Sequence, residues 1–191
     1  GDFKFKTGIV MVPNASGGFT KTGSKSVVMD VASTYTGVTT VEEGTLKLGV
    51  DDAIKCSSGV YLSGGVLDVD EKAFDRPILG GCGAIVNVGH ALTTGTTLSF
   101  KGVDLASKKA LSSDAEIALA SGAVVSLDDL APLVASGKHT FTLMTSAVAI
   151  TGNLPELDRT VFTDAKWHMY LTADRKSLKL NDGTGMMLIV H

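Results

Sequence analysis

Short runs in which apolar and polar residues alternate, separated by Gly, Ser, Thr or Asp, make up most of this chain. Residues 45–48 and 66–69 alternate in this way, while residues 38–41 contain only Val and Thr, whose branched Cβ atoms favour a pleated strand. Alternation with period two, and short apolar runs between turn residues, predict a mostly β protein. The expected strands are residues 3–6, 8–12, 26–30, 38–41, 45–48, 60–62, 66–69, 84–88, 97–100, 116–119, 124–127, 140–144, 167–171, 177–180 and 186–190.

Helical periodicity is confined to two stretches. A helix is predicted over residues 127–135, with Ser126 or Asp128 as its cap and a glycine after its last turn. The apolar residues that share one face of this helix are Leu130, Leu133 and Val134. A weaker helical pattern covers residues 105–111.

An internal repeat of the form Gly-x-apolar-x-apolar runs through the middle of the chain. Residues 44–49, 65–70 and 83–88 are copies of it, at steps of 21 and 18 residues, and residues 122–127 are a looser copy. A step of about twenty residues is typical of one turn of a β-solenoid, in which each unit buries its apolar face by stacking on its neighbours. A β-sandwich, the alternative, has no need of a regular step.

The repeat and the strand pattern together predict a two-part architecture. Residues 1–130 are expected to form a short parallel β-helix, that is, a β-solenoid. Residues 131–191, with their longer strands, are expected to form a β-rich cap, because the last coil of a solenoid otherwise exposes unpaired backbone groups. The two parts are also compatible with one continuous domain.

The most specific sequence signal lies in residues 30–49. It contains Tyr-Thr-Gly at 35–37, Thr-Thr at 39–40 and Gly-Thr-Leu-Lys-Leu-Gly at 44–49. These blocks, at this spacing, resemble the passenger-associated β-strand repeat of bacterial autotransporters. Two positions depart from that repeat, since Ser33 replaces the usual Asn and Val38 replaces the usual second Gly. Residues 139–181 weakly resemble the segment that often follows such repeats in secreted proteins.

The resemblance has consequences for both fold and function. It implies a right-handed parallel β-helix that is secreted or exposed on the surface of a bacterial cell, in a stalk or adhesin-like role. It implies no catalytic residues and no cofactor. The expected partner is a glycan or a protein on a host or neighbouring surface, and the protein is expected not to be an enzyme. A carbohydrate-binding β-sandwich is a weaker alternative.

Composition narrows the class of partner. The 191 residues suffice for one domain or two small ones, and the formal net charge of -3 argues against a nucleic-acid partner. No apolar run reaches the roughly 18 residues needed to cross a bilayer, so the chain is expected not to span a membrane. The chain starts with Gly1 rather than Met, which predicts that an earlier N-terminus, with room for an export signal, has been removed.

A group of acidic residues suggests a second function. Its members are Asp51, Asp52, Asp68, Asp70, Glu71 and Asp75. They fall about one coil apart, so they are expected to stack near one another, where they would repel unless Ca²⁺ or a basic group such as Lys55, Lys72 or Arg76 lay between them. This cluster leaves open a carbohydrate-active β-helix enzyme, a polysaccharide lyase or hydrolase; the simpler interpretation is a solvated charge cluster.

The two cysteines, Cys56 and Cys82, are 26 residues apart, close to one coil plus a loop. Adjacent coils place Cα atoms within disulfide range, and an exported protein meets an oxidising compartment. A Cys56–Cys82 disulfide is therefore one expectation, and two separate buried thiols are the other.

Two further sequence patterns predict neither a cofactor site nor a metal site. Residues 18–26 are rich in Gly, Ser, Thr and Lys, but a phosphate loop needs Lys directly after its second Gly, and here Ser24 intervenes. A solvated turn is expected there instead. The histidines lie far apart and lack metal-ligand spacing, and His168 is expected on the face of a strand.

Overall fold

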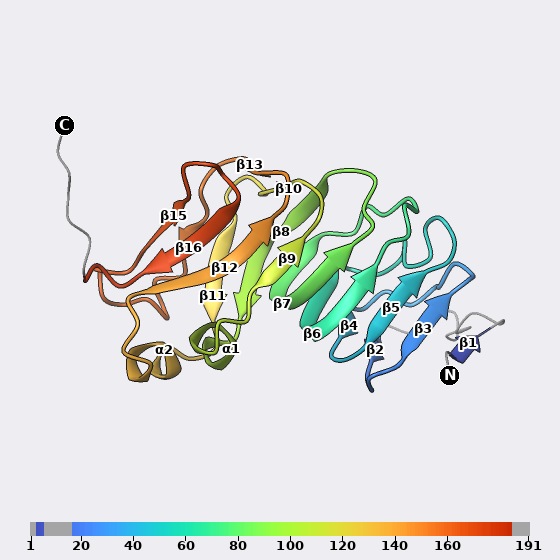
Figure 1. The fold of residues 1–191 in the computed structure, drawn as a ribbon, viewed down its shortest axis with the longest axis horizontal. Coiled ribbons are helices and arrows are strands. Elements are labelled where there is room, and N and C mark those ends of the chain that lie inside the picture. The colour runs from blue at the N-terminus through green and yellow to red at the C-terminus, as the bar shows by residue number, and fades with distance from the viewer. Residues whose placement is uncertain (1–2, 6–16, 185–191) are drawn as a thin grey trace.

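The computed structural model describes residues 3–5 and 17–184, and the strands of this part of the chain join into one large sheet (Figure 1). The predicted all-β class is confirmed. The strands are β1 (Phe3–Phe5), β2 (Phe19–Lys21), β3 (Ser26–Met29), β4 (Thr39–Val41), β5 (Thr45–Leu48), β6 (Val60–Asp68), β7 (Ile78–Val86), β8 (Leu92–Phe100), β9 (Leu111–Ser113), β10 (Ile117–Ala118), β11 (Val124–Leu127), β12 (Thr140–Ser146), β13 (Ile150–Thr151), β14 (Glu156–Leu157), β15 (His168–Leu171) and β16 (Ser177–Asn181). The strands expected at 8–12 and 186–190 lie outside the described residues.

Most strands pair in parallel and form rows along the long axis of the molecule (Figure 1). The first row is β1, β3, β5, the end of β6, the end of β7, β9 and the end of β12. The second row is β2, β4, the start of β6, the start of β7, β8, β11 and β14. A shorter third row joins β8, β10 and β13. Because β6 pairs with β4 at its start and with β5 at its end, it passes from the second row to the first.

The sequence repeat corresponds to the first row. Leu46, Leu67 and Ile85, at the same position of the three repeat copies, lie side by side in register, and each is at most 1% exposed. Burying a side chain of this size contributes about 1.5–3 kcal/mol relative to leaving it exposed. The looser copy at 122–127 belongs elsewhere, because β11 pairs with β8 and β14 in the second row.

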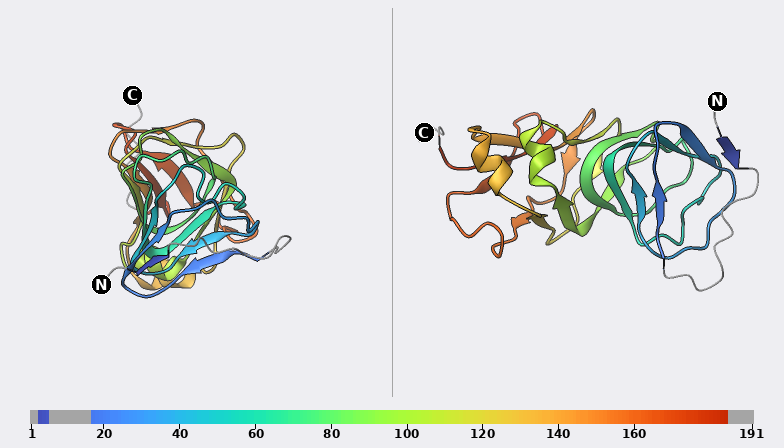
Figure 2. Two further views of the ribbon diagram at one scale, coloured as in Figure 1. Left: turned by 90° about the vertical axis from the view of Figure 1, so that its right-hand side faces the viewer. Right: turned by 90° about the horizontal axis from the view of Figure 1, so that it is seen from below.

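The interior is a single apolar cluster that extends through the stack of strands. Buried residues alternate with more exposed ones in both halves of β6, at Val60 and Leu62 and, after a shift of one position at the two glycines, at Gly65 and Leu67. Seen along the long axis, the strands of each row overlie one another around this interior (Figure 2). The narrow interior is filled mainly by aliphatic side chains, in agreement with the low aromatic content of 6%.

The end of the described chain is built differently. β12 pairs antiparallel with β16, and β16 pairs antiparallel with β15. Trp167 packs against Phe141 and Phe162, with ring centroids 6.3 Å and 5.9 Å away, and forms an aromatic cluster beneath these strands. The change from parallel to antiparallel pairing ends the rows at this side of the molecule.

The helix predicted over 127–135 is shorter than expected, and the one predicted over 105–111 is largely wrong, because the helix there ends at Ala106 and a strand begins at Leu111. α1 (Gly102–Ala106) and α2 (Ala131–Ala135) lie in the connections between β8 and β9 and between β11 and β12, and they contact one another (Figure 1). Of the predicted helical face around α2, Leu133 is fully buried but Val134 is 68% exposed. Asp128 is not a cap for α2, because its Oδ1 atom accepts a hydrogen bond of 2.9 Å from the backbone N–H of Gly102. Neither helix in the described part of the chain is long or apolar enough to cross a membrane.

Candidate functional site

The repeat motif of residues 30–49 contributes β4 to the second parallel row and β5 to the first. Its Tyr-Thr-Gly block lies in the loop between β3 and β4, its Thr-Thr pair lies on β4, and its last block covers β5. Gly44, which opens that last block, has φ +62°, and a Cβ atom there would lie 2.6 Å from the carbonyl oxygen of Gly23. The turn between β4 and β5 therefore needs glycine at this position.

A buried polar network connects the repeat motif to the segment that precedes β6. Tyr35 is 1% exposed, and its hydroxyl group lies 2.7 Å from Oγ1 of Thr39. Oγ1 of Thr39 donates to Oγ of Ser57 at 2.9 Å, and Oγ of Ser57 lies 2.9 Å from the carbonyl oxygen of Gly37. Burial raises the pKa of Tyr35 to about 12, although the hydrogen bond to Thr39 acts in the opposite direction. The phenol thus stays protonated at neutral pH, and the network is suited to holding the loop in place.

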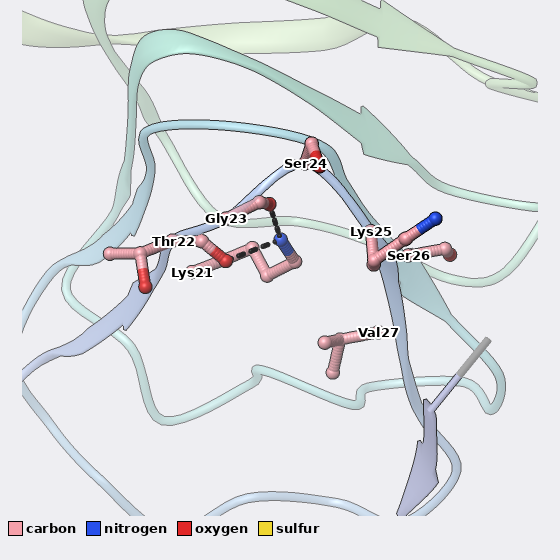
Figure 3. A pocket seen from close by; sticks show the side chains of 7 residues that line it. All are labelled: Lys21, Thr22, Gly23, Ser24, Lys25, Ser26 and Val27. Atoms are coloured by element: carbon pink, nitrogen blue, oxygen red, sulfur yellow. Dashed lines mark hydrogen bonds between the residues drawn. The ribbon is translucent and has the colours of Figure 1, made fainter. Parts of the chain in front are cut away.

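The glycine-rich segment at 18–26 contains β2 and the exposed turn that leads from it to β3, and the buried lysine at the end of β2 is bonded to that turn. The cavity beside it, of about 380 Å³, is lined by residues 21–27 (Figure 3). Lys21 is only 3% exposed, and its ammonium group donates to the carbonyl oxygens of Thr22, Gly23 and Glu43 at 2.7, 2.6 and 2.9 Å. These contacts use all three donors of the ammonium group, so it is not directed at a phosphate.

The structure brings only part of the predicted acidic cluster together. Lys47, on β5, lies between two of its members, with Nζ 2.8 Å from Oδ1 of Asp70 and 3.9 Å from Oδ2 of Asp68. The amide group of Asn87 donates to Oδ1 of Asp68 at 2.8 Å. The hydrogen bond from Lys47 lowers the pKa of Asp70, which keeps this carboxylate ionised. Lys47, a residue that the sequence analysis did not single out, is therefore the main cation between the carboxylates.

The other acidic residues have separate environments. Oδ1 of Asp51 accepts a hydrogen bond of 2.8 Å from the backbone N–H of Ala73, and Asp75 pairs with Arg76 at 2.6 Å. Asp52 and Glu71 are exposed and have positive φ values of 59°. Within the described residues, no group of three or more His, Cys, Asp and Glu side chains is arranged to hold a metal ion.

The structure does not join the two cysteines. Cys56 is a free, exposed thiol in the loop before β6, and Cys82 is a free, buried thiol on β7. In register, Cys82 lies beside Ser63 of β6, whereas Cys56 lies outside that strand, in the loop before it. Burial, together with Asp104, raises the pKa of Cys82 to about 11, so its thiolate is scarce at neutral pH.

The contacts of His139 could not be predicted from the sequence. Nδ1 of His139 lies 3.0 Å from Oδ2 of Asp182 and 2.6 Å from the hydroxyl group of Thr184. These residues are more than forty positions apart and meet only because β12 and β16 pair antiparallel. No spacing in the sequence signals this pairing. His168 lies on β15, as expected for a histidine on a strand face.

Comparison with known proteins bears on the repeat. The model of the family described as passenger-associated-transport-repeat matches residues 19–48. No curated protein and no solved structure matches the chain. The match covers β2 and β4 of the second row and β3 and β5 of the first row. The autotransporter-type resemblance found in residues 30–49 is thereby confirmed, since the segment from Phe19 to Leu48 matches the passenger-associated transport repeat.

Proposed function

We propose that this protein is a non-enzymatic module, secreted or exposed on the surface of a bacterial cell, whose scaffold is a right-handed parallel β-helix. The observation that carries the proposal is the passenger-associated transport repeat at residues 19–48, since such repeats belong to passenger segments of autotransporters. In this view the repeat is the first part of a rod, and the loops between the coils are the surfaces offered to a partner.

The β-helix assignment is supported by strand pairing. Every pair within the three rows is parallel. Strand β6 passes from the second row to the first, and the chain then returns to form β7, which pairs with β6 at positions about twenty residues further along the sequence. Connections between parallel strands of one sheet are right-handed in about 98% of cases, which favours the right-handed form. We assign residues 1–130 to the β-helix and 131–191 to a cap that ends in the antiparallel β15–β16 pair, with one continuous domain as the alternative division.

A structural, partner-binding role agrees better with the side chains than an enzymatic one. Asp68 and Asp70 are the members of the acidic cluster that share a cation, Lys47, and Asp68 also accepts a hydrogen bond from Asn87. An acid–base pair for glycoside cleavage needs carboxylates that are free to reach the sugar. The proposed partner is therefore a surface glycan or protein that is bound rather than cleaved.

The proposal is tested by locating the protein in the cells that produce it. We expect antibodies against the chain to label intact cells or the culture medium, and added protease to remove the label from intact cells. Protein confined to the cytoplasm would contradict the proposal. A parallel assay measures new reducing ends in acidic and neutral polysaccharides; release that is lost in Asp68→Asn or Asp70→Asn would establish the enzymatic alternative.

A further inference from the structure

The third parallel row ends at β13, which pairs on one side only, with β10. In a parallel strand the N–H and C=O groups of successive residues point alternately to the two sides. On the side of β10, the carbonyl oxygen of Thr151 accepts a hydrogen bond of 3.0 Å from the backbone N–H of Leu119. The backbone groups of Ile150 and Gly152, on either side of Thr151, therefore face away from β10, along the outer edge of the row.

The turn between β15 and β16 lies beside this outer edge, and one of its residues binds to it (Figure 1). The guanidinium group of Arg175 donates from Nε to the carbonyl oxygen of Ile150 at 3.0 Å and from Nη2 to that of Gly152 at 3.1 Å. The backbone N–H of Ile150 in turn donates to the carbonyl oxygen of Arg175 at 2.6 Å. Arg175 thus occupies three of the backbone groups that a further strand would use.

The turn is braced in a shape that presents this arginine. The backbone N–H of Thr172 donates to the carbonyl oxygen of Ser177 at 3.0 Å, and the carbonyl oxygen of Thr172 accepts from the N–H of Arg175 at 2.7 Å. Arg175 has φ +53°, in the left-handed region that glycine adopts freely and that is unfavourable for a residue with a Cβ atom. A glycine would fit this turn without strain, so the contribution of Arg175 lies in its side chain.

The guanidinium group is not engaged in an ion pair. No carboxylate of the described residues lies within 4.0 Å of it. The adjacent carboxylate, Asp174, accepts hydrogen bonds from the hydroxyl group of Thr172 and the backbone N–H of Lys176 instead. The fork of donors on Arg175 therefore serves the carbonyl oxygens of β13, as expected for a group that covers a strand edge.

We propose that Arg175 keeps the β15–β16 turn bound to β13 and thereby prevents the end of the third row from pairing with a second copy of this chain. Exposed strand edges favour pairing with other chains, and natural proteins commonly cover such an edge with a loop. A second copy is the relevant partner because it carries the same edge, and two identical edges can pair about a two-fold axis. This role is independent of the partner-binding function proposed above, since it depends only on strand pairing.

The test is sedimentation velocity of the purified chain over a series of concentrations, with a reductant present because Cys56 is an exposed thiol. Arg175→Gly removes the guanidinium group and also relieves the left-handed backbone, whereas Arg175→Ala removes the guanidinium group alone. Both variants should form dimers at concentrations where the wild type stays monomeric. Hydrogen exchange of the Ile150 amide, which reports whether the turn is bound to β13, should be about tenfold faster or more in both variants.

A matched control separates the loss of the hydrogen bonds from the loss of charge. Lys176→Ala removes the neighbouring, exposed positive charge of the same turn and should behave like the wild type. Fluorescence of Trp167, which is buried near β15, checks that each variant is folded. The proposal is overturned if Arg175→Gly leaves the exchange of Ile150 or the sedimenting mass unchanged, or if Lys176→Ala dimerises to the same extent. Should both Arg175 variants unfold, exchange of the wild type decides: a protected Ile150 amide supports the bound turn, and one that exchanges like an exposed amide contradicts it.

Discussion

The hydroxyl groups of Tyr35 and Thr39 lie 2.7 Å apart in the buried interior, within the transport repeat and four residues apart along the chain. Thr39 is fully buried and is also bonded to Ser57, on the next layer of chain. A hydroxyl group in this position therefore joins the loop before β4 to the segment that leads into β6.

Replacing Thr39 by Val should destabilise the protein by about 1–3 kcal/mol, because it removes the buried partner of Tyr35 and Ser57 while keeping the volume of the side chain. Thr39→Ser, which keeps the hydroxyl group, should cost less. Urea denaturation followed by circular dichroism measures both. Equal stability of Thr39→Val and the wild type would show that the network does not hold the loop.

Leu67→Ala should cost about 2–5 kcal/mol of unfolding free energy, because Leu67 is fully buried between Leu46 and Ile85 and its removal leaves a cavity. Val134→Ala is the control, since Val134 is 68% exposed and its truncation should stay within about 0.5 kcal/mol. The same denaturation assay compares them. Similar losses in the two variants would argue against the register of the first row.

Acid should weaken the end of β16 through Asp182. Burial alone would raise the pKa of this carboxyl group, but the hydrogen bonds from Thr184 and His139 outweigh burial and lower it to about 2. A group whose pKa is lower in the folded state stabilises the fold above its unfolded pKa of about 3.9, and this contribution is lost as the pH falls towards 2. Unfolding free energy should therefore fall over this range, and less so in Asp182→Asn. Asp52→Asn, at an exposed carboxylate, should behave like the wild type; an unchanged acid response in Asp182→Asn would contradict the assignment.

The two thiols should differ in reactivity. Cys56 is exposed, whereas Cys82 is buried and its pKa is raised to about 11, so iodoacetamide at pH 8 should label Cys56 first and Cys82 only after unfolding. Mass spectrometry of the digested protein locates the label, and a Cys56→Ser variant gives the matched control with one remaining thiol. Protein purified without reductant that takes up no label even when unfolded would instead support the Cys56–Cys82 disulfide.

Much of the fold could be predicted from local sequence. Alternation marked the strands, and the steps of 21 and 18 residues placed residues 46, 67 and 85 in one row, because repeats of similar length bring equivalent positions side by side. The same reasoning failed for residues 122–127, where the connection containing α1 lengthens the path between rows. A copy of the motif then no longer predicts the same place in the rows of strands.

The candidate sites depended on the tertiary structure. The sequence by itself determined a β-rich chain with a transport repeat, since both follow from residues close together along the chain. Only the folded structure decided that Lys47 lies between Asp68 and Asp70, and that His139 meets Asp182. Such contacts join residues from different strands, so their partners are set by register and by the lengths of the connecting segments.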